Sequence, residues 1–207
     1  MAENHKIETY ILPNGEVVQY IDETHTYIVN GEELPSVTTL LTRFYGDIYG
    51  SVRPDLLKRS AEYGTEVHKD LQTLIEIRQE DDSIPLVSDY QEVQNYFNFI
   101  EPIYGIKPIS TEKVVVLHDK TGKPVAAGRF DLLCTVKGEL TLADFKTTTA
   151  VHKQLVTAQL NIYVMAAYQS GYIDTQNIKL GVIHLSGKTS KFIPIQKLDD
   201  DFYLQFI

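Results

Sequence analysis

The sequence is poor in cysteine and has no long uninterrupted run of apolar residues. Its single cysteine, Cys134, cannot form a disulfide within the chain and cannot by itself hold a zinc ion or an iron–sulfur cluster. Nowhere do about 18 consecutive apolar residues occur, as a membrane-spanning helix requires. The first residues are polar and mixed in charge, unlike a secretory signal. We therefore expect a cytoplasmic protein that does not use cysteine chemistry.

Positive charge is also scarce. The 207 residues include 19 lysines and arginines against 28 aspartates and glutamates, which gives a net charge of −9. This balance argues against a protein that coats nucleic acid by electrostatics alone. A nuclease stays possible, because such an enzyme needs only a local cationic path and because bound divalent metal neutralises its carboxylates.

The length and an ordinary composition predict one folded domain. Hydrophobic residues make up 43% of the chain and charged residues 23%, which is close to the usage of globular proteins. We divide the single domain, 1–207, into an N-terminal hairpin with a connecting region (1–54), a core (55–185), and a C-terminal strand with a short helix (186–207).

Periodicity predicts the first elements. Two β-rich runs around a polar stretch predict a hairpin over residues 17–29, and Ser36 is placed to cap a short helix over 37–44. Steps of three and four between apolar or small residues predict a helix over 55–80. A second helix is expected from residue 89, with Pro102 beyond its end. The expected buried stripe of the first long helix consists of Leu57, Ala61, Gly64, His68, Leu71 and Ile75.

The second half of the core has the pattern of strands. Runs of β-branched and apolar residues over 111–117, 125–136 and 140–145 predict three consecutive antiparallel strands. A helix over 151–170 and strands over 178–185 and 191–196 follow. The order helix, three strands, helix, strand implies an α/β fold with a mixed central sheet flanked by helices.

One hairpin of this sheet brings two aspartates together. If Lys137-Gly138 is a two-residue loop, Val136 faces Glu139, and the same register puts Asp131 opposite Asp144. Like charges opposed across a ladder are unfavourable, so the pair needs a cation between them. Mg²⁺ or Mn²⁺ would supply it, because hard cations prefer oxygen ligands and keep positions open for water.

The same register assigns the neighbouring side chains to faces. Leu133, Leu142 and Lys146 share the face of the two carboxylates, while Phe130 lies across from Phe145 on the other face. Lys146 is then near enough to pair with a phosphate or to orient a water. The alternative is that Lys146 only forms a salt bridge to the aspartates on a half-exposed sheet face.

Four short motifs in this arrangement carry a family resemblance. Gly128-Arg129-Phe130-Asp131 followed by Asp144-Phe145-Lys146-Thr147 resembles the PD-(D/E)xK nuclease superfamily, in its RecB-like and phage-exonuclease branch. Gly64-Thr65-Glu66-Val67-His68 resembles the helical histidine motif, and Gln159-Leu160-Asn161-Ile162-Tyr163 resembles the QxxxY motif. The resemblance implies a restriction-endonuclease-like αβββαβ core. Members with an iron–sulfur cluster need four cysteines, so that branch is excluded.

The resemblance also implies roles for individual residues. Asp131 and Asp144 would be metal ligands, His68 would complete the metal site, and Lys146 would position the attacking water and stabilise phosphate charge. A hydrogen-bonded core histidine is the alternative for His68, which lies on an apolar stripe.

Four further residues are candidates with open alternatives. Gln159 and Tyr163 share a helix face and could contact Lys146, a phosphate or a base, or could be buried polar supports. Glu112 could be an additional acid of the site or a surface glutamate. Arg129 lies on the Asp131 face and could hold a DNA phosphate or pair with a neighbouring acid.

The resulting hypothesis is a deoxyribonuclease that hydrolyses phosphodiester bonds with Mg²⁺ or Mn²⁺. The resemblance favours an exonuclease acting on DNA with free ends, single- or double-stranded, in phage or prophage recombination or repair. A recombination or repair protein as partner and an oligomer are compatible with this setting, and a membrane is not.

Two alternatives belong to other classes. One is a catalytically idle nuclease fold that serves as a nucleic-acid-binding or assembly module. The other is a P-loop protein, suggested by Gly187-Lys188-Thr189. The preceding Gly181 is one residue too far away for that motif, and a strand rather than a helix follows. We therefore expect a hairpin turn over residues 186–189.

Overall fold

The strands form two sheets within the residues that the computed structural model describes, which are 6–46, 50, 52–186 and 189–207. The N-terminal sheet is an antiparallel meander in the order β1-β2-β3-β4. Its strands are β1 (Ile7–Ile11), β2 (Val17–Ile21), β3 (Thr26–Val29) and β4 (Glu32–Leu34). The predicted hairpin over 17–29 is therefore confirmed as β2 and β3, but it is part of a larger sheet. β4 is an unpredicted strand, because Asn30 and Gly31, both at positive φ, form a second hairpin loop that the sequence pattern had not indicated.

The central sheet has the order β5-β6-β7-β8-β9. Its strands are β5 (Ile106–His118), β6 (Pro124–Val136), β7 (Glu139–Lys146), β8 (Lys179–His184) and β9 (Lys191–Ile195). β7 and β8 are parallel and the other neighbours are antiparallel, so the sheet is mixed. The chain is thus an α/β protein, as its pattern of elements predicts.

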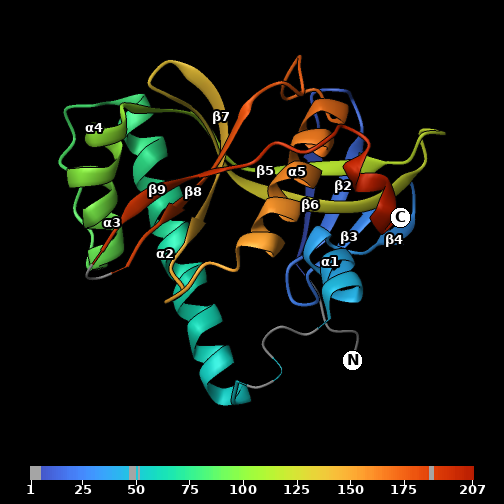
Figure 1. The fold of residues 1–207 in the computed structure, drawn as a ribbon, viewed down its shortest axis with the longest axis horizontal. Coiled ribbons are helices and arrows are strands. Elements are labelled where there is room, and N and C mark those ends of the chain that lie inside the picture. Colours follow the sequence, from blue (N-terminus) through green and yellow to red (C-terminus); the bar gives the residue numbers. More distant parts are fainter. Residues whose placement is uncertain (1–5, 47–49, 51, 187–188) are drawn as a thin grey trace.

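Helices cover both faces of the central sheet (Figure 1). α1 (Val37–Tyr45) and α5 (Lys153–Gln169) share a buried cluster with Phe130, Leu133 and Leu142. α2 (Pro54–Glu80) and α3 (Gln91–Asn95) share a second cluster with Leu132 and Phe145. The N-terminal sheet packs on β5 and β6 through a third cluster. A short 3₁₀ helix, Phe202–Phe206, ends the chain.

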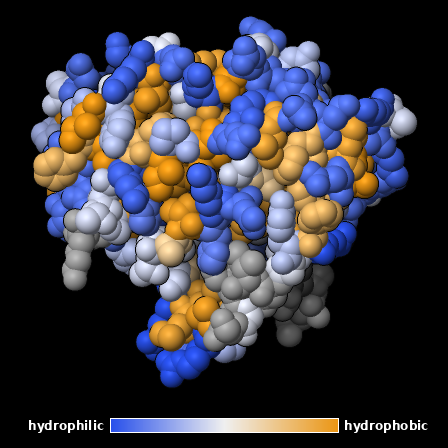
Figure 2. Space-filling view, in the orientation of Figure 1, coloured by the Kyte–Doolittle hydropathy of each residue, from blue (hydrophilic) through white to orange (hydrophobic). Residues whose placement is uncertain are grey.

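Only the second half of α2 has side chains buried against the rest of the protein. Leu71 and Ile75 are buried as the stripe predicts, but Leu57 and Ala61 are exposed. Figure 1 shows the reason, because the first half of α2 extends beyond the rest of the molecule. Figure 2 shows hydrophobic as well as hydrophilic side chains on the surface of this projecting part, where Leu56 is also exposed. The prediction of a buried stripe is therefore wrong for Leu57 and Ala61, since helical periodicity does not report where the packing partner ends.

The second predicted helix runs through Pro102 instead of ending before it. α3 continues into a π-helical turn, Tyr96–Ile100, and then into α4 (Glu101–Tyr104), with Pro102 in its first turn. A proline inside a regular α-helix removes one hydrogen bond and clashes with the preceding turn. The wider turn directly before Pro102 changes that hydrogen-bond pattern and allows the chain to stay helical.

The hairpin register at the centre of the sheet is confirmed. Val136 pairs with Glu139, and the same register continues to Leu132 and Ala143. Lys137 and Gly138 both have positive φ, 51° and 86°, as a two-residue hairpin loop of this kind requires.

Two further expectations concern a membrane-spanning helix and the turn over residues 186–189. No helix among the described residues has the length and apolar character that crossing a membrane needs. Gly187 and Lys188 of the expected turn lie outside the described residues. Ser186 and Thr189 on either side are hydrogen-bonded to each other.

Candidate metal centre

Three side chains from separate elements converge at one point beside the central sheet. His68 of α2, Glu112 of β5 and Asp131 of β6 each offer a ligand atom, and these atoms lie within 4.8 Å of one another. The Nδ1 atom of His68 is 3.6 Å from an Asp131 oxygen and 3.9 Å from a Glu112 oxygen. All three side chains are partly buried and partly exposed, so the group is reachable from solvent.

An irregularity shared by β5 and β6 makes this convergence possible. Thr111 pairs with Leu132 and Lys113 pairs with Phe130, so Glu112 and Asp131 stand opposite each other between two regular pairs. Glu112 has a left-handed backbone, with φ of 48°. Such a conformation is costly for a glutamate inside a strand and is typical of sites where a side chain must be re-aimed.

The irregularity overturns one expectation about faces. Phe130 packs with α5, in the cluster of Leu133 and Leu142, whereas Phe145 packs with α2. The two phenylalanines therefore lie on opposite faces of the sheet, not across from each other on one face. Strict alternation fails because β6 changes face between Phe130 and Leu132, at Asp131.

Asp131 is fixed by the backbone of the neighbouring strand. The Phe145 N–H donates a hydrogen bond of 2.7 Å to Asp131 Oδ2, just beyond the last regular pair of β6 and β7. The His68 ring lies edge-on to the Phe145 ring, with 5.9 Å between the centroids. Phe145 thus holds both residues, one through its backbone and one through its ring.

Asp144 and Lys146 form a second group next to the first. Asp144 is only 3% exposed, and its carboxylate lies 2.5 Å from the Lys146 ammonium. Burial raises the pKa of Asp144 to about 6, although the charge of Lys146 opposes this shift. Asp144 is not among the three residues within 4.8 Å, because its carboxylate is turned to Lys146.

The electrostatics of the site suit a divalent cation. Burial raises the pKa of Glu112 to about 8, and the nearby charge of Asp131 contributes to the same shift. Two carboxylates and one imidazole lie close together here, with a third carboxylate nearby, and the acids repel one another when all of them are ionised. Carboxylate oxygens and imidazole nitrogen are donors for Mn²⁺, and the oxygens suit Mg²⁺. The residues present therefore fit such an ion.

Gln159 and Tyr163 lie on α5, which packs against the sheet face of Leu142. Tyr163 is 5% exposed, and Gln159 lies beside its hydroxyl. A Cβ atom at Gly128 would be 2.8 Å from the Tyr163 ring, so the glycine leaves the space that the ring occupies. Of the two interpretations, a substrate contact or a buried support, the burial of Tyr163 favours the support.

Gly128→Ala is expected to destabilise the protein by about 1–3 kcal/mol through overpacking against Tyr163. Chemical denaturation of Gly128→Ala, of Tyr163→Leu and of the double variant Gly128→Ala/Tyr163→Leu measures the coupling. The double variant should lose less stability than the two single variants together. Full additivity would contradict a direct steric conflict.

Arg129 is held by the N-terminal sheet. It donates a hydrogen bond of 2.9 Å to the Tyr10 hydroxyl, and its guanidinium lies over the rings of Tyr10 and Tyr20. Among the described residues, these aromatic contacts and not a salt bridge to an acid hold Arg129, and a DNA phosphate as its partner stays a prediction. The aromatic rings come from β1 and β2, which no local sequence pattern connects with the site.

His184 is a neighbour of the site that the sequence pattern does not reveal. β7 and β8 are parallel, and the register pairs Lys146 with His184 and Asp144 with Val182. Partners in a ladder point to the same side, so His184 lies on the face of Asp144 and Lys146. The position of His184 depends on the pairing of β7 with β8, and α5 separates these two strands in the sequence. No local sequence pattern indicates this pairing.

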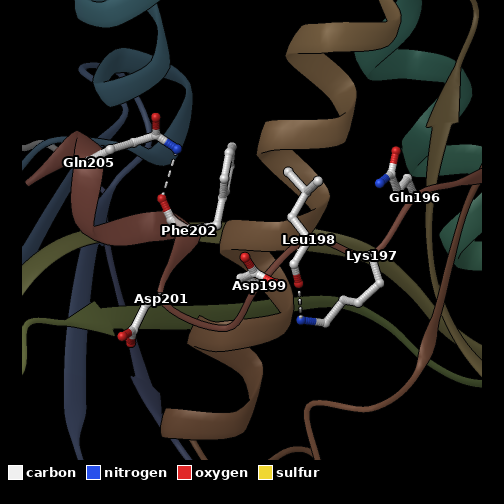
Figure 3. A pocket seen from close by; sticks show the side chains of 7 residues that line it. All are labelled: Gln196, Lys197, Leu198, Asp199, Asp201, Phe202 and Gln205. Atoms are coloured by element: carbon white, nitrogen blue, oxygen red, sulfur yellow. Dashed lines mark hydrogen bonds between the residues drawn. The ribbon is translucent and has the colours of Figure 1, made fainter.

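A hollow on the surface lies away from the candidate site (Figure 3). It has a volume of about 440 Å³ and contains none of the expected site residues. Its lining residues are Gln196, Lys197, Leu198, Asp199, Asp201, Phe202 and Gln205. Lys197 pairs with Asp200 at 2.7 Å, and two aspartates line the hollow, so it suits a polyanion poorly.

Comparisons with known proteins add little to this description. No family model matches the chain, and no curated protein matches it. Among solved structures, the crystal structure of SSO0001 is similar over 86% of this chain and 74% of that chain. The sequence identity is 16% and the TM-score is 0.46, a similarity too low to say anything about activity.

Proposed function

We propose that this protein is a divalent-metal-dependent deoxyribonuclease with a restriction-endonuclease-like core. More specifically, we propose an exonuclease of the phage or prophage type that acts on DNA with free ends in recombination or repair. Mg²⁺ or Mn²⁺ is the proposed cofactor, and the proposed substrate bond is the DNA phosphodiester.

The observation that carries this proposal is the convergence of His68, Glu112 and Asp131 beside the Asp144–Lys146 pair. These side chains come from α2, β5, β6 and β7, which are far apart in the sequence. All of them except Glu112 belong to the motifs by which the chain resembles PD-(D/E)xK nucleases, and Glu112 is the additional acid. Structural ion pairs alone rarely need a histidine, several acids and a strained strand residue in one place.

The order of elements supports the proposed core. After α2 come the short helical segments α3 to α4, then the antiparallel strands β5, β6 and β7, then α5, and then β8 parallel to β7. This is the order αβββαβ that the family resemblance implies. The N-terminal sheet, α1, the segment from α3 to α4, and β9 are additions to it.

The residues have separate tasks in the proposed reaction. A cation held by His68, Glu112, Asp131 and Asp144 would polarise the phosphate and favour a hydroxide over a water. Lys146 bears its positive charge next to these carboxylates, where it can stabilise charge that develops on the phosphate oxygens. The Phe145 backbone and ring hold two of the proposed ligands in place.

An end-labelled linear DNA and a closed circular DNA test the proposal together. With Mg²⁺ or Mn²⁺ the linear DNA should be degraded, and with a chelator it should stay intact. The linear form should disappear faster than the circle if the enzyme needs a free end. Gel analysis of both substrates over time gives these rates.

Three results would count against parts of the proposal. Full cleavage by metal-stripped protein would refute the metal-dependent mechanism. Equal rates on the two substrates would indicate an endonuclease. Binding of DNA without any cleavage would favour the alternative of a catalytically idle nucleic-acid-binding module.

A further inference from the structure

The segment that follows Lys146 is held from two sides. Thr147 lies against α2, where its hydroxyl oxygen is 3.3 Å from the position that a Cβ atom of Gly64 would take. The Thr148 carbonyl lies 2.7 Å from the Nε2 atom of His184 on β8. In addition, the Leu185 N–H donates a hydrogen bond of 2.8 Å to the Lys146 carbonyl. The end of β7 is therefore clamped between the helix that carries His68 and the strand that carries His184.

His184 contributes a polar side-chain bond to this clamp. It is 7% exposed and lies next to Lys146 on the same face of the sheet. A carbonyl oxygen only accepts hydrogen bonds, so Nε2 must carry the proton of this contact. The other ring nitrogen, Nδ1, is buried and has no hydrogen-bond partner among the described residues. A buried ring nitrogen without a hydrogen bond costs free energy of folding that a leucine at this position would not cost.

We propose that His184 is a positioning residue, which sets the place of the Lys146 ammonium by holding the Thr148 carbonyl. This inference rests on the proposed nuclease function. The chain leaves the sheet directly after Lys146, and a strand end without fixed partners has freedom to move. The bond from His184 removes that freedom at Thr148, and Thr147 of the same segment lies close to Gly64 of α2. The position of Lys146 is thereby set by contacts of the residues that follow it and not by the Asp144–Lys146 ion pair alone.

Three variants separate this role from simple packing. His184→Leu removes the donor and keeps most of the volume. His184→Gln offers an amide N–H at about the reach of Nε2, and is the conservative variant. Ile183→Val, at the next residue on the opposite face, removes one buried methylene and is the matched control for stability.

The experiments use the full-length variants. They measure the single-turnover cleavage rate at saturating DNA, the affinity for Mn²⁺ by titration, and the melting temperature. His184→Leu should slow cleavage by about 10- to 100-fold, as expected when a supporting contact of a site is lost. Its affinity for Mn²⁺ should stay within about threefold of the parent, because His184 is not a proposed ligand. Loss of a residue that supports a metal ligand typically weakens metal binding by about 10- to 100-fold. His184→Gln should recover most of the rate, and Ile183→Val should cleave like the parent. A parental rate in His184→Leu, or no recovery in His184→Gln, would overturn the proposal.

A second readout does not depend on cleavage. The ¹⁵N and ¹³C signals of the Lys146 side chain, assigned by their absence in Lys146→Met, report the surroundings of its ammonium. They should move in His184→Leu, return towards the parent in His184→Gln and stay in place in Ile183→Val. If the parent protein does not cleave DNA, the proposed function fails while this measurement still decides the role of His184. If the Lys146 signals are the same in all three variants, the positioning role is refuted even in an active enzyme.

Discussion

Asp131→Asn and Asp144→Asn are each expected to reduce DNA cleavage to background while the protein stays folded. An amide keeps the shape of the carboxylate but loses the charge that holds a divalent cation. In Asp131→Asn the amide oxygen can still accept the hydrogen bond from the Phe145 N–H, so the strand end should persist. Both variants should also bind Mn²⁺ more weakly. Metal titration and single-turnover cleavage check the two effects separately.

Lys146→Ala should behave differently from the aspartate variants. It should slow the chemical step by about 10²- to 10³-fold, as loss of one charge-stabilising group does, and leave Mn²⁺ bound. Without metal it should lower the melting temperature, because Asp144 is then buried without its cationic partner. Asp201→Asn, in an exposed pair with Lys120, is the control and should change neither rate nor metal affinity. Parental cleavage by both aspartate variants would show that the site is wrong, and unfolding of all three would favour a structural salt bridge.

Glu112→Gln is expected to change stability and activity in opposite directions. The variant should melt at a higher temperature than the parent in chelator at about pH 8, because a buried carboxylate no longer has to ionise. It should bind Mn²⁺ more weakly and cleave DNA at least about tenfold more slowly, since one oxygen ligand has lost its charge. Melts in chelator, melts with Mn²⁺ and cleavage rates measure the three effects.

The pH dependence of the metal-free protein follows from the same carboxylates. Burial raises the pKa of Glu112 from 4.5 to about 8, so the folded state holds this proton more tightly than the unfolded state does. The stability from this proton is complete below pH 4.5 and is lost as the pH rises through about 8. Asp144 acts in the same direction at a lower pH.

The melting temperature in chelator should therefore fall between about pH 5 and pH 8, by an amount that reflects about 1.4 kcal/mol for each unit of pKa shift. Glu112→Gln should flatten this fall, and Mn²⁺ should reverse it. Glu32→Gln, at an exposed position of β4, is the control and should follow the parent curve. Identical pH curves for Glu112→Gln and the parent would place Glu112 outside the group of interacting acids.

Local patterns of the sequence were sufficient for the strands of the central sheet, for most helices and for the hairpin register. The two-residue loop at Lys137 and Gly138 leaves one register for β6 and β7, and the structure has that register from Val136 to Leu132. Ser36 caps α1 as its position predicts, with its side chain accepting a bond from the Thr39 N–H. These features depend on residues within a few positions of one another, where the chemistry of a turn or a cap decides the outcome.

The candidate site could be predicted only in part for the same reason. One hairpin register predicts Asp131 opposite Asp144, and the observed ladder ends one pair earlier, at Leu132 and Ala143. Glu112 was a minor candidate, because no rule of alternation indicates that β5 and β6 change face at one opposed pair. The wrong placement of Phe130 has the same cause. Period two holds only while the pleat is regular.

The sequence by itself determined the order of the long helices and of the strands of the central sheet, the α/β class and which side chains carry charge, since these depend on short-range periodicity and composition. Only the tertiary structure decided that His68, Glu112 and Asp131 meet, that Tyr10 and Tyr20 hold Arg129, and that His184 stands beside Lys146. Each of these contacts joins residues of different elements that are far apart in the sequence. Their formation depends on how helices and sheets pack, and packing is chosen by the burial of the whole core and not by any local pattern.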